Sequence, residues 1–336
     1  MTFEFTASEV IVKNPKNPLI KSTMMPYPST LTFNAGVTKF QGRYVMVFRN
    51  DYNFTREGIE AHKTAGAKLD LKINLGLAFS DDGITWEISP EPFVPFELND
   101  EWLRAYDPRL TVIDGRCYMC FAVDTRHGIR GGIAVTDDFE RFDLLTMTVP
   151  DNRNMVLFPE KIGGNYVRLE RPFPVYGRGG KDFFDIWLSE SPDMRFWGDH
   201  KLVLGTENVA FCNDKIGPGA PPVKTRAGWL TTFHAVWRYR DKKLYSWAGN
   251  WEKEYFAGIM LLDIDNPSKV VGICPEPLLK AENQYELEGY RGSVIFPGGM
   301  ILEDSGEVKI YYGAADTTEC LAGICVDELI SLCKKI

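Results

Sequence analysis

Apolar and polar residues alternate along most of the chain in short runs, and one two-strand pattern recurs five times. Each copy has an alternating run, a polar turn that contains glycine, and a second alternating run. This period of two predicts strands with one buried face, and the glycine-containing turn predicts a hairpin between them. The copies are VTKFQGRYVMVFRND (37–51), LTVIDGRCYMCFAVD (110–124), EKIGGNYVRLERP (160–172), PVKTRAGWLTTFHAV (222–236) and MILEDSGEVKIYYGAAD (300–316).

A further apolar run follows every hairpin, and four of the five such runs lead into an Asp-rich turn. The unit is therefore three or four strands, repeated five times. Repeats of this size in an all-β pattern are typical of a β-propeller. We expect one domain over residues 1–336, a five-bladed β-propeller with its ligand at one end of the central channel. A two-sheet β-sandwich of similar size is the alternative.

Helical periodicity is weak throughout the chain, and no segment of helix length competes with the strand pattern. Residues 326–336 (VDELISLCKKI) fit a short helix or a closing strand equally well. The segment SDDGITW (80–86) resembles the Asp-box turns of some propellers, which stabilise the fold and do not take part in catalysis.

Composition narrows the class of protein. The 336 residues are 44% hydrophobic and 25% charged, which is typical of a globular protein, and the net charge of −8 argues against a general nucleic-acid or acidic-membrane surface. No signal peptide is evident at the N-terminus, and no apolar run approaches the ~20 residues that span a bilayer. The seven cysteines are scattered and the four histidines lack metal-ligand spacing. We expect a cytoplasmic protein with reduced thiols and no metal.

Polar residues gather at equivalent places when the repeats are aligned, often beside apolar neighbours. Charges inside a strand pattern are costly to bury unless they are paired or used, so their convergence on one channel predicts a site. The acidic and neutral members are Asn34, Asp51, Asp107, Asn154 and Asp316. The basic members are Arg49, Arg153, Arg171, Lys215 and His234. In an acidic protein, a shared cluster of such cations would bind an anion, and arginine forks suit phosphate.

Asp107 is followed directly by Pro108 and Arg109 at the start of a predicted strand. Proline biases the preceding residue towards extended geometry, so we expect Asp107 on stiff, extended backbone. A structural ion pair with Arg109 is the alternative to a catalytic role. Single members of the basic set also fit solvated strand ends, and His234 fits a buried core histidine, so the prediction depends on the whole set.

Six segments together resemble glycoside hydrolase family 130, the β-mannoside phosphorylases and related mannosidases. They are FNAGV (33–37), AYDPRL (105–110), NRNMVLFPEKIGGNYVRLERP (152–172), DKIGPGAPP (214–222), TFHAV (232–236) and YYGAADT (311–317). The resemblance covers nearly the whole chain and also implies a five-bladed propeller.

This resemblance implies a role for each site residue. Asp107 corresponds to the catalytic acid, and the phosphate-binding set corresponds to Arg153, Asn154, Arg171, Lys215 and His234. Asp316 corresponds to a contact with the mannosyl unit, and Asn34, Arg49 and Asp51 to the pocket around that unit. Tyr245 resembles an aromatic position near the acceptor sugar. Hydrolytic members of the family lack the basic set, which this sequence keeps.

The residue types agree with phosphorolysis. An inverting glycosidase needs an acid and a base, whereas a phosphorylase needs only the acid, because phosphate is already an anionic nucleophile. We therefore expect inverting phosphorolysis of β-mannosides, with β-1,4 linkage favoured over β-1,2, and α-mannose 1-phosphate as product. Inorganic phosphate is a co-substrate and no cofactor is implied. The alternatives are a hydrolase on the same fold and a non-catalytic sugar-binding propeller. The resemblance also suggests a homo-oligomer.

Overall fold

All five predicted hairpins form in the computed structural model, which describes residues 4–93, 101–174 and 183–335. The turn glycines Gly42, Gly115, Gly164, Gly228 and Gly306 all have positive φ, between 78° and 139°. Glycine adopts this backbone conformation at no steric cost, which explains why each turn carries one. Each hairpin supplies inner strands of an antiparallel sheet, and the apolar run that follows it adds the next strand.

Each sheet is one blade of the fold, and the blades follow one another along the chain. Blade 1 contains β2 (Leu31–Phe40), β3 (Arg43–Tyr52), β4 (Lys72–Ser80) and β5 (Glu87–Ile88). Blade 2 contains β6 (Trp102–Ile113), β7 (Arg116–Thr125), β8 (Gly128–Thr136) and β9 (Asp143–Met147). Blade 3 contains β10 (Asn152–Leu157), β11 (Tyr166–Pro172), β12 (Ile186–Ser191) and β13 (Gly198–Leu204).

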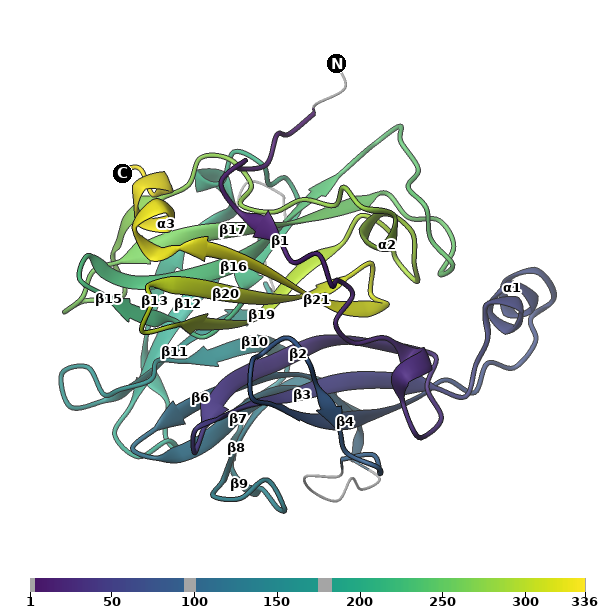
Figure 1. The fold of residues 1–336 in the computed structure, drawn as a ribbon, viewed down its shortest axis with the longest axis horizontal. Coiled ribbons are helices and arrows are strands. Elements are labelled where there is room, and N and C mark those ends of the chain that lie inside the picture. The colour runs from purple at the N-terminus through teal and green to yellow at the C-terminus, as the bar shows by residue number, and fades with distance from the viewer. Residues whose placement is uncertain (1–3, 94–100, 175–182, 336) are drawn as a thin grey trace.

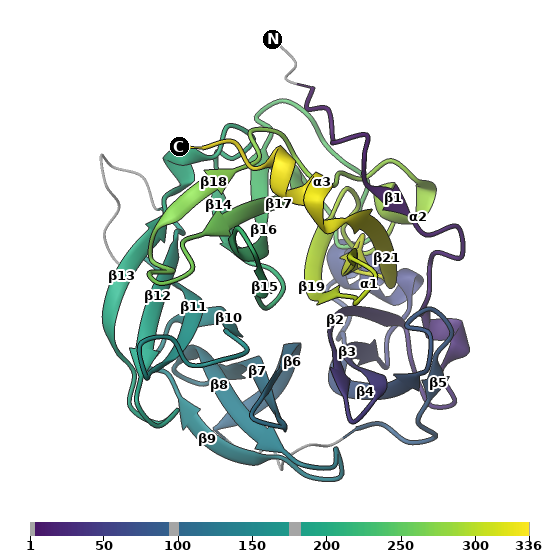
Figure 2. The same ribbon diagram turned by 60° about the vertical axis from the view of Figure 1, so that its left-hand side comes forward.

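Blades 4 and 5 complete the ring. Blade 4 contains β14 (Lys215–Pro218), β15 (Val223–Thr225), β16 (Gly228–Arg238), β17 (Lys253–Leu262) and β18 (Val270–Ile273). Blade 5 contains β19 (Ile295–Leu302), β20 (Glu307–Ala314), β21 (Thr318–Cys325) and, from the other end of the chain, β1 (Val12–Lys13). Figure 2 shows the five sheets arranged around a common axis. The five-bladed propeller is confirmed, and the sandwich alternative is wrong.

The hydrophobic core is itself a ring, with one apolar cluster at every junction between neighbouring blades. One pair of buried residues represents each junction. In order from blades 1 and 2 round to blades 5 and 1, the pairs are Val47 with Met119, Cys120 with Leu157, Leu169 with Phe233, Ala257 with Ile310, and Met46 with Tyr311. A sandwich would concentrate its core in one layer between two sheets. The circular core is what leaves the axis free for polar side chains.

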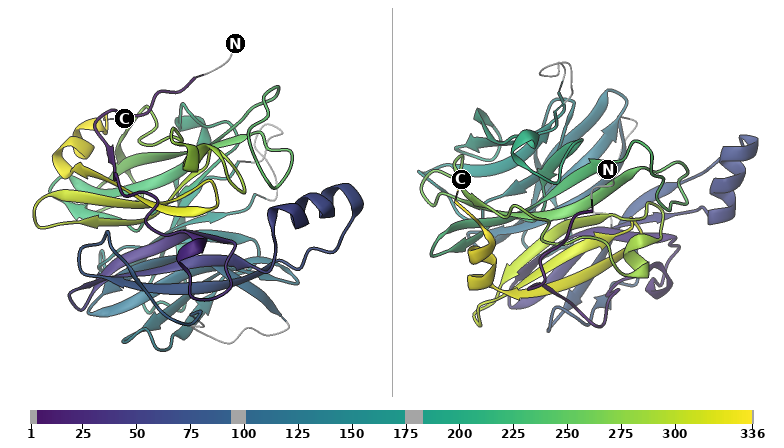
Figure 3. Two further views of the ribbon diagram at one scale, coloured as in Figure 1. Left: turned by 45° about the vertical axis from the view of Figure 1, so that its right-hand side comes forward. Right: turned by 90° about the horizontal axis from the view of Figure 1, so that it is seen from above.

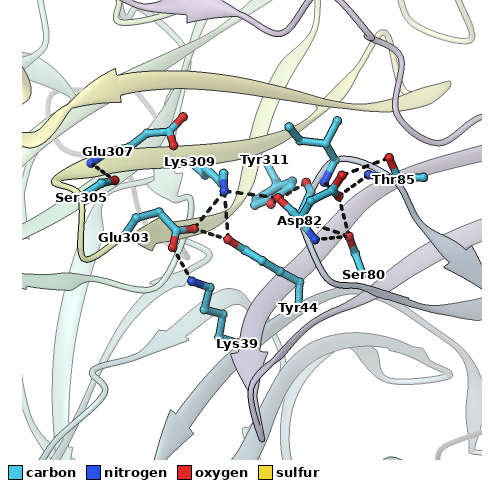
Figure 4. A network of polar contacts seen from close by, with 12 residues as sticks. Lys39, Tyr44, Ser80, Asp82, Thr85, Glu303, Ser305, Glu307, Lys309 and Tyr311 are labelled. Carbon is cyan, nitrogen blue, oxygen red and sulfur yellow. Dashed lines mark hydrogen bonds and ion pairs between the residues drawn. The ribbon is translucent and has the colours of Figure 1, made fainter.

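Two devices close the ring between the first and last blades. β1 pairs with β21, so the N-terminal segment provides the outer strand of blade 5. A polar network, shown in Figure 4, joins the same blades: Glu303 accepts hydrogen bonds from Tyr44, Lys39 and Lys309, and Lys309 also donates to the backbone oxygen of Asp82. The ring is thus closed both by a pair of strands and by a polar network made mostly by side chains.

The described residues contain three short α-helices outside the blades: α1 (Arg56–Ala65), α2 (Gln284–Leu287) and α3 (Val326–Leu332), with 3-10 turns at Ser22–Met24 and Thr206–Asn208. The C-terminal segment, for which the sequence allowed a short helix or a closing strand, forms the helix α3. α1, between β3 and β4, projects from the body of the propeller (Figures 1 and 3). The sequence reasoning missed it, although Thr55 caps its start and Gly66 ends it in a left-handed conformation. None of the helices in the described ranges is long and apolar enough to cross a membrane.

The Asp-rich turns act as fold devices. Asp82 Oδ1 accepts hydrogen bonds from the backbone amides of Ile84 and Thr85, each at 2.7 Å. The carboxylates of Asp138, Asp193 and Asp263 accept backbone amides in the same way after β8, β12 and β17. A carboxylate that bonds its own turn satisfies amides that the ladder leaves free.

Candidate active site

One pocket at an end of the central axis gathers side chains from all five blades. About 520 Å³ of space lies between the protein atoms there, a figure that includes space open to solvent. Most of the residues predicted from the sequence line it: Asn34, Arg49, Asp107, Arg153, Asn154, Arg171, Lys215, His234 and Asp316. Asp51 lies directly behind Arg49 and accepts two hydrogen bonds from its guanidinium, at 2.6 and 2.7 Å.

Tyr245 is the exception among the predicted residues. The residue is 37% exposed, its ring lies 5.7 Å from the guanidinium carbon of Arg56, and it does not belong to the described lining of the pocket. From the same blade, Tyr255 and Trp251 line the pocket. β17 carries Tyr255 inward, whereas Tyr245 lies in the loop before that strand. The acceptor-side role expected for Tyr245 stays a prediction.

The inner strands of blades 1, 2 and 3 share an irregularity that aims their side chains at the pocket. The pairing register shifts after Phe33 in β2, after Tyr106 in β6 and after Arg153 in β10, and the next residue in each case has left-handed φ: Asn34 at 54°, Asp107 at 52° and Asn154 at 60°. A β-bulge inserts an extra residue and re-aims its side chain, and Asn and Asp tolerate this conformation best after glycine.

The expectation that Asp107 lies in extended backbone is therefore wrong. Its φ of 52° places it in the bulge of β6, two residues of which stand opposite one residue of β7. Pro108 nevertheless suits this position. A bulge leaves the amide of its second residue without a ladder partner, and proline has no amide hydrogen to satisfy.

Asp107 contacts blade 1 rather than its sequence neighbour Arg109. Its Oδ1 accepts a hydrogen bond from Asn34 Nδ2 at 3.0 Å and lies 3.7 Å from a terminal nitrogen of Arg49. The buried guanidinium of Arg109 donates instead to the backbone oxygens of Pro108, Gly219 and Pro297. Arg109 thus ties three blades together at the axis, and the suggested Asp107–Arg109 ion pair is not formed.

Four basic residues form one wall of the pocket: Arg153, Arg171, Lys215 and His234. Arg171 donates from a terminal nitrogen to His234 Nε2 at 3.0 Å, and both side chains are buried. Burial, with the neighbouring charge of Arg153, lowers the pKa of Arg171 to about 9. Burial, with the charge of Arg171, holds the pKa values of Lys215 and His234 well below their ordinary values. His234 is therefore neutral, and Nδ1 carries its proton.

This wall has donors and positive charge in excess. Within residues 4–93, 101–174 and 183–335, no acidic side chain pairs with Arg153, Arg171 or Lys215. Arg153 Nε, Arg171 Nε and His234 Nδ1 are buried there without a hydrogen-bond partner. Buried polar atoms in folded proteins are nearly always satisfied, so this arrangement suits an anionic ligand with several acceptor oxygens.

The opposite wall is acidic but balanced by arginines. Asp316 pairs with Arg291 at 3.2 Å, and burial raises the pKa of its carboxyl. Arg49 lies between Asp51 and Asp107. Such alternating donors and acceptors suit the hydroxyl groups of a sugar, each of which donates and accepts.

The sequence reasoning missed several lining residues: Tyr106, Trp251, Tyr255, Arg291, Val294 and Phe296. The rings of Trp251, Tyr255 and His234 stack in sequence, with centroids 6.0 and 6.2 Å apart. The guanidinium of Arg291 lies 5.4 Å from the ring of Trp251. The one usable signal was alternation, since Tyr255 is paired with Val236, two residues from His234. No cluster of His, Cys, Asp or Glu suited to a metal occurs in the described part of the chain.

Comparisons with known proteins agree on one family. The glycoside hydrolase family 130 model, described as beta-1,4-mannooligosaccharide phosphorylase, matches residues 10–335. The beta-1,4-mannooligosaccharide phosphorylase of Ruminococcus albus is 34% identical over 97% of this chain and 91% of its own length. A 1,2-beta-oligomannan phosphorylase of Thermoanaerobacter sp. is 32% identical over 76% of this chain and 78% of its own. The solved beta-1,2-mannobiose phosphorylase of Listeria innocua, in complex with beta-1,2-mannobiose, superposes with a TM-score of 0.79 at 25% identity, covering 96% of this chain and 98% of that one.

Proposed function

The chain belongs to glycoside hydrolase family 130 and is a β-mannoside phosphorylase, and we propose that it acts on β-1,4-linked mannosides by inverting phosphorolysis. Two findings support the linkage. The family model carries the β-1,4 description, and the β-1,4-specific relative aligns over 97% of the chain, whereas the β-1,2 oligomannan enzyme aligns over 76%. The substrates are mannooligosaccharides or mannosyl-N-acetylglucosamine.

The observation that carries the proposal is a cationic wall that shares the pocket with Asp107 and for which the described residues provide no acidic partner. Phosphate binds to Arg153, Asn154, Arg171, Lys215 and His234, which supply both charge and directed donors. A phosphate dianion offsets the repulsion among the positive charges of Arg153, Arg171 and Lys215, so the pocket gains electrostatic stability when it is filled. A hydrolase would have no use for such a wall.

Asp107 is the proton donor. A phosphate oxygen attacks the anomeric carbon of the terminal mannosyl unit as the bond from that carbon to the bridging oxygen breaks, and the proton from Asp107 reaches the departing oxygen. Attack from the face opposite the leaving group gives α-mannose 1-phosphate and a shortened acceptor. Positioning and electrostatic stabilisation of phosphate replace the general base.

The remaining residues hold the sugar. Asn34, Arg49 and Asp316 surround the mannosyl unit through hydroxyl hydrogen bonds, and Asp51 holds Arg49 from behind. Asn34 and Arg49 also contact Asp107. Tyr255 and Trp251 offer stacked rings to the acceptor side, and pyranose rings pack well on aromatic faces.

A panel of substrates tests the proposal. We would incubate the protein with β-1,4-mannobiose, β-1,4-mannosyl-N-acetylglucosamine and β-1,2-mannobiose, each with and without inorganic phosphate, and measure mannose 1-phosphate and free mannose. We expect mannose 1-phosphate only with phosphate, and faster turnover of a β-1,4 substrate. Faster turnover of β-1,2-mannobiose would overturn the linkage, and phosphate-independent release of mannose would overturn phosphorolysis.

A further inference from the structure

A buried carboxylate that the reaction scheme does not use lies behind the contact between Asn34 and Asp107. Glu319 is the second residue of β21 in blade 5 and is fully buried. Its Oε2 accepts a hydrogen bond from the backbone amide of Ala35, in blade 1, at 3.1 Å. Ala35 is the second residue of the β2 bulge, and Asn34 is the first. Glu319 therefore reaches from one blade into the bulge of the next.

The second residue of the β2 bulge has a backbone amide that requires a hydrogen-bond acceptor, whereas the second residue of the β6 bulge has none. In both bulges the first residue is left-handed, Asn34 in β2 and Asp107 in β6. The second residue in β6 is Pro108, which has no amide hydrogen, whereas the second residue in β2 is Ala35, which has one. A buried amide without an acceptor destabilises the fold. Glu319 supplies the acceptor from the neighbouring blade.

Blade 5 also fits closely around the same bulge. A Cβ on Gly298 would lie 2.0 Å from the backbone oxygen of Ala35, and a Cβ on Gly313 would lie 2.3 Å from Asn34 Oδ1. Contacts this short leave no room for side chains, so glycine is required at both positions. Asn34 is thus enclosed by blade 5, and its Nδ2 points at Asp107 Oδ1, 3.0 Å away.

We propose that Glu319 is a positioning residue for proton transfer, which holds the β2 bulge so that Asn34 orients the carboxylate of Asp107. The inference rests on the proposed role of Asp107 as proton donor. It assigns Glu319 no contact with substrate. Its effect passes through the Ala35 amide to Asn34, and from Asn34 to Asp107.

The protonation state of Glu319 suits this role. Burial raises the pKa of its carboxyl to about 8, so the group is uncharged at neutral pH and adds no negative charge beside Asp107. Glutamine has the same shape and charge as the protonated acid, and its amide oxygen can accept from Ala35. Its amide nitrogen would replace Oε1, which has no hydrogen-bond partner in the described structure. Glu319→Gln is therefore the conservative variant and Glu319→Ala the disruptive one.

The test compares two leaving groups. We would measure kcat and the KM for phosphate with β-1,4-mannobiose and with 2,4-dinitrophenyl β-mannoside, whose leaving group needs no proton. Asp107→Asn sets the scale for loss of proton donation on each substrate. We expect Glu319→Ala to lower kcat on mannobiose at least ~10-fold, to lower it less than ~3-fold on the aryl mannoside, and to leave the KM for phosphate within ~2-fold. Glu319→Gln should stay within ~2-fold of the original protein throughout.

A second variant keeps the test decisive if Glu319→Ala folds poorly. Ala35→Pro combined with Glu319→Ala removes the amide together with its acceptor and reproduces the arrangement at Asp107 and Pro108. We expect this double variant to recover most of the mannobiose activity that Glu319→Ala loses. Failure of the double variant to recover activity would overturn the assigned hydrogen bond.

The outcomes separate the two hypotheses. Equal losses for Glu319→Ala on both substrates would show a general structural role and overturn the inference, as would no loss on either substrate or a Glu319→Gln variant as impaired as Glu319→Ala. If Asp107→Asn itself loses equally on both substrates, the proton-donor assignment fails first. If Asp107→Asn shows the leaving-group dependence and Glu319→Ala does not, only the inference about Glu319 falls.

Discussion

Replacement of Arg171 by methionine should stabilise the fold and damage phosphate binding at the same time. Arg171 is 1% exposed, and in the described structure its guanidinium has a hydrogen bond to His234 and lies 5.6 Å from the rings of Phe173 and Phe184. No acidic side chain among the described residues pairs with it. Methionine keeps the length and apolar packing of the side chain and removes its charge.

The size of the expected stabilisation follows from the electrostatics of the pocket. Arginine stays protonated in proteins, so a pKa lowered from 12.5 to about 9 expresses the free energy that the folded state loses by holding this charge. At 1.36 kcal/mol per pKa unit, that free energy is at most about 5 kcal/mol. Loss of the hydrogen bond to His234 and of the ring contacts offsets about 2–3 kcal/mol. We expect the free energy of unfolding to rise by roughly 1–3 kcal/mol.

Binding should change in the opposite direction. A charge-assisted hydrogen bond contributes about 1.5–3 kcal/mol, and an arginine fork offers phosphate two. Their loss should lower kcat/KM for phosphate at least ~100-fold. Saturating phosphate at ~100 times its Kd should stabilise the original protein by about 2.7 kcal/mol, and this gain should vanish in the variant.

Urea unfolding with and without phosphate, together with steady-state phosphorolysis, measures both effects. Arg116→Met is the matched control, because Arg116 forms an exposed ion pair with Asp137 that should contribute less than about 1 kcal/mol. The reasoning is refuted if Arg171→Met lowers the unfolding free energy by more than about 1 kcal/mol without phosphate, or leaves kcat/KM for phosphate unchanged.

Three further predictions concern other parts of the structure. Burial and the charge of Arg171 hold the pKa of His234 well below 6.5, so near that pH the unfolded chain binds a proton at this histidine that the folded protein does not. The free energy of unfolding should therefore rise between pH 5.5 and 7. His234→Asn should reduce the slope of that rise by up to ~1.4 kcal/mol per pH unit in urea titrations. Tyr255→Ala should raise the KM for the mannoside at least ~10-fold, whereas Tyr245→Ala should leave it within ~2-fold. Equal effects of the two variants in initial-rate assays would contradict a role for Tyr255, and not Tyr245, in holding the mannoside. Glu303→Gln should lower the unfolding free energy by about 1–3 kcal/mol without changing kcat, and a loss of activity at full stability would show that the ring-closing network reaches the pocket.

The repeated fold was predictable because each hairpin carries its own local signal. Gly42 and its four counterparts mark turns that require positive φ, and alternation marks the flanking strands. The site followed from the repeats: residues at equivalent places in successive blades end up at the same end of the axis. That is why charges as distant in sequence as Arg49 and Asp316 could be grouped before the structure was known.

The parts that escaped prediction depend on geometry that alternation does not encode. The left-handed bulge at Asp107 was hidden by Pro108, which suggested extended backbone. Arg291 reaches the pocket from a loop, and a loop has no periodicity to reveal where its side chains point. Glu319 lies in a strand pattern, and nothing in that pattern indicates that its carboxylate reaches the neighbouring blade.

The most direct test of phosphorolysis with a single acid is to follow the reaction by ¹H and ³¹P nuclear magnetic resonance, with β-1,4-mannobiose and inorganic phosphate. The account predicts that the α anomer of mannose 1-phosphate is formed first and alone, with one phosphate consumed for each mannosyl unit released. Free mannose as the first product, or a β-linked phosphate ester, would contradict it.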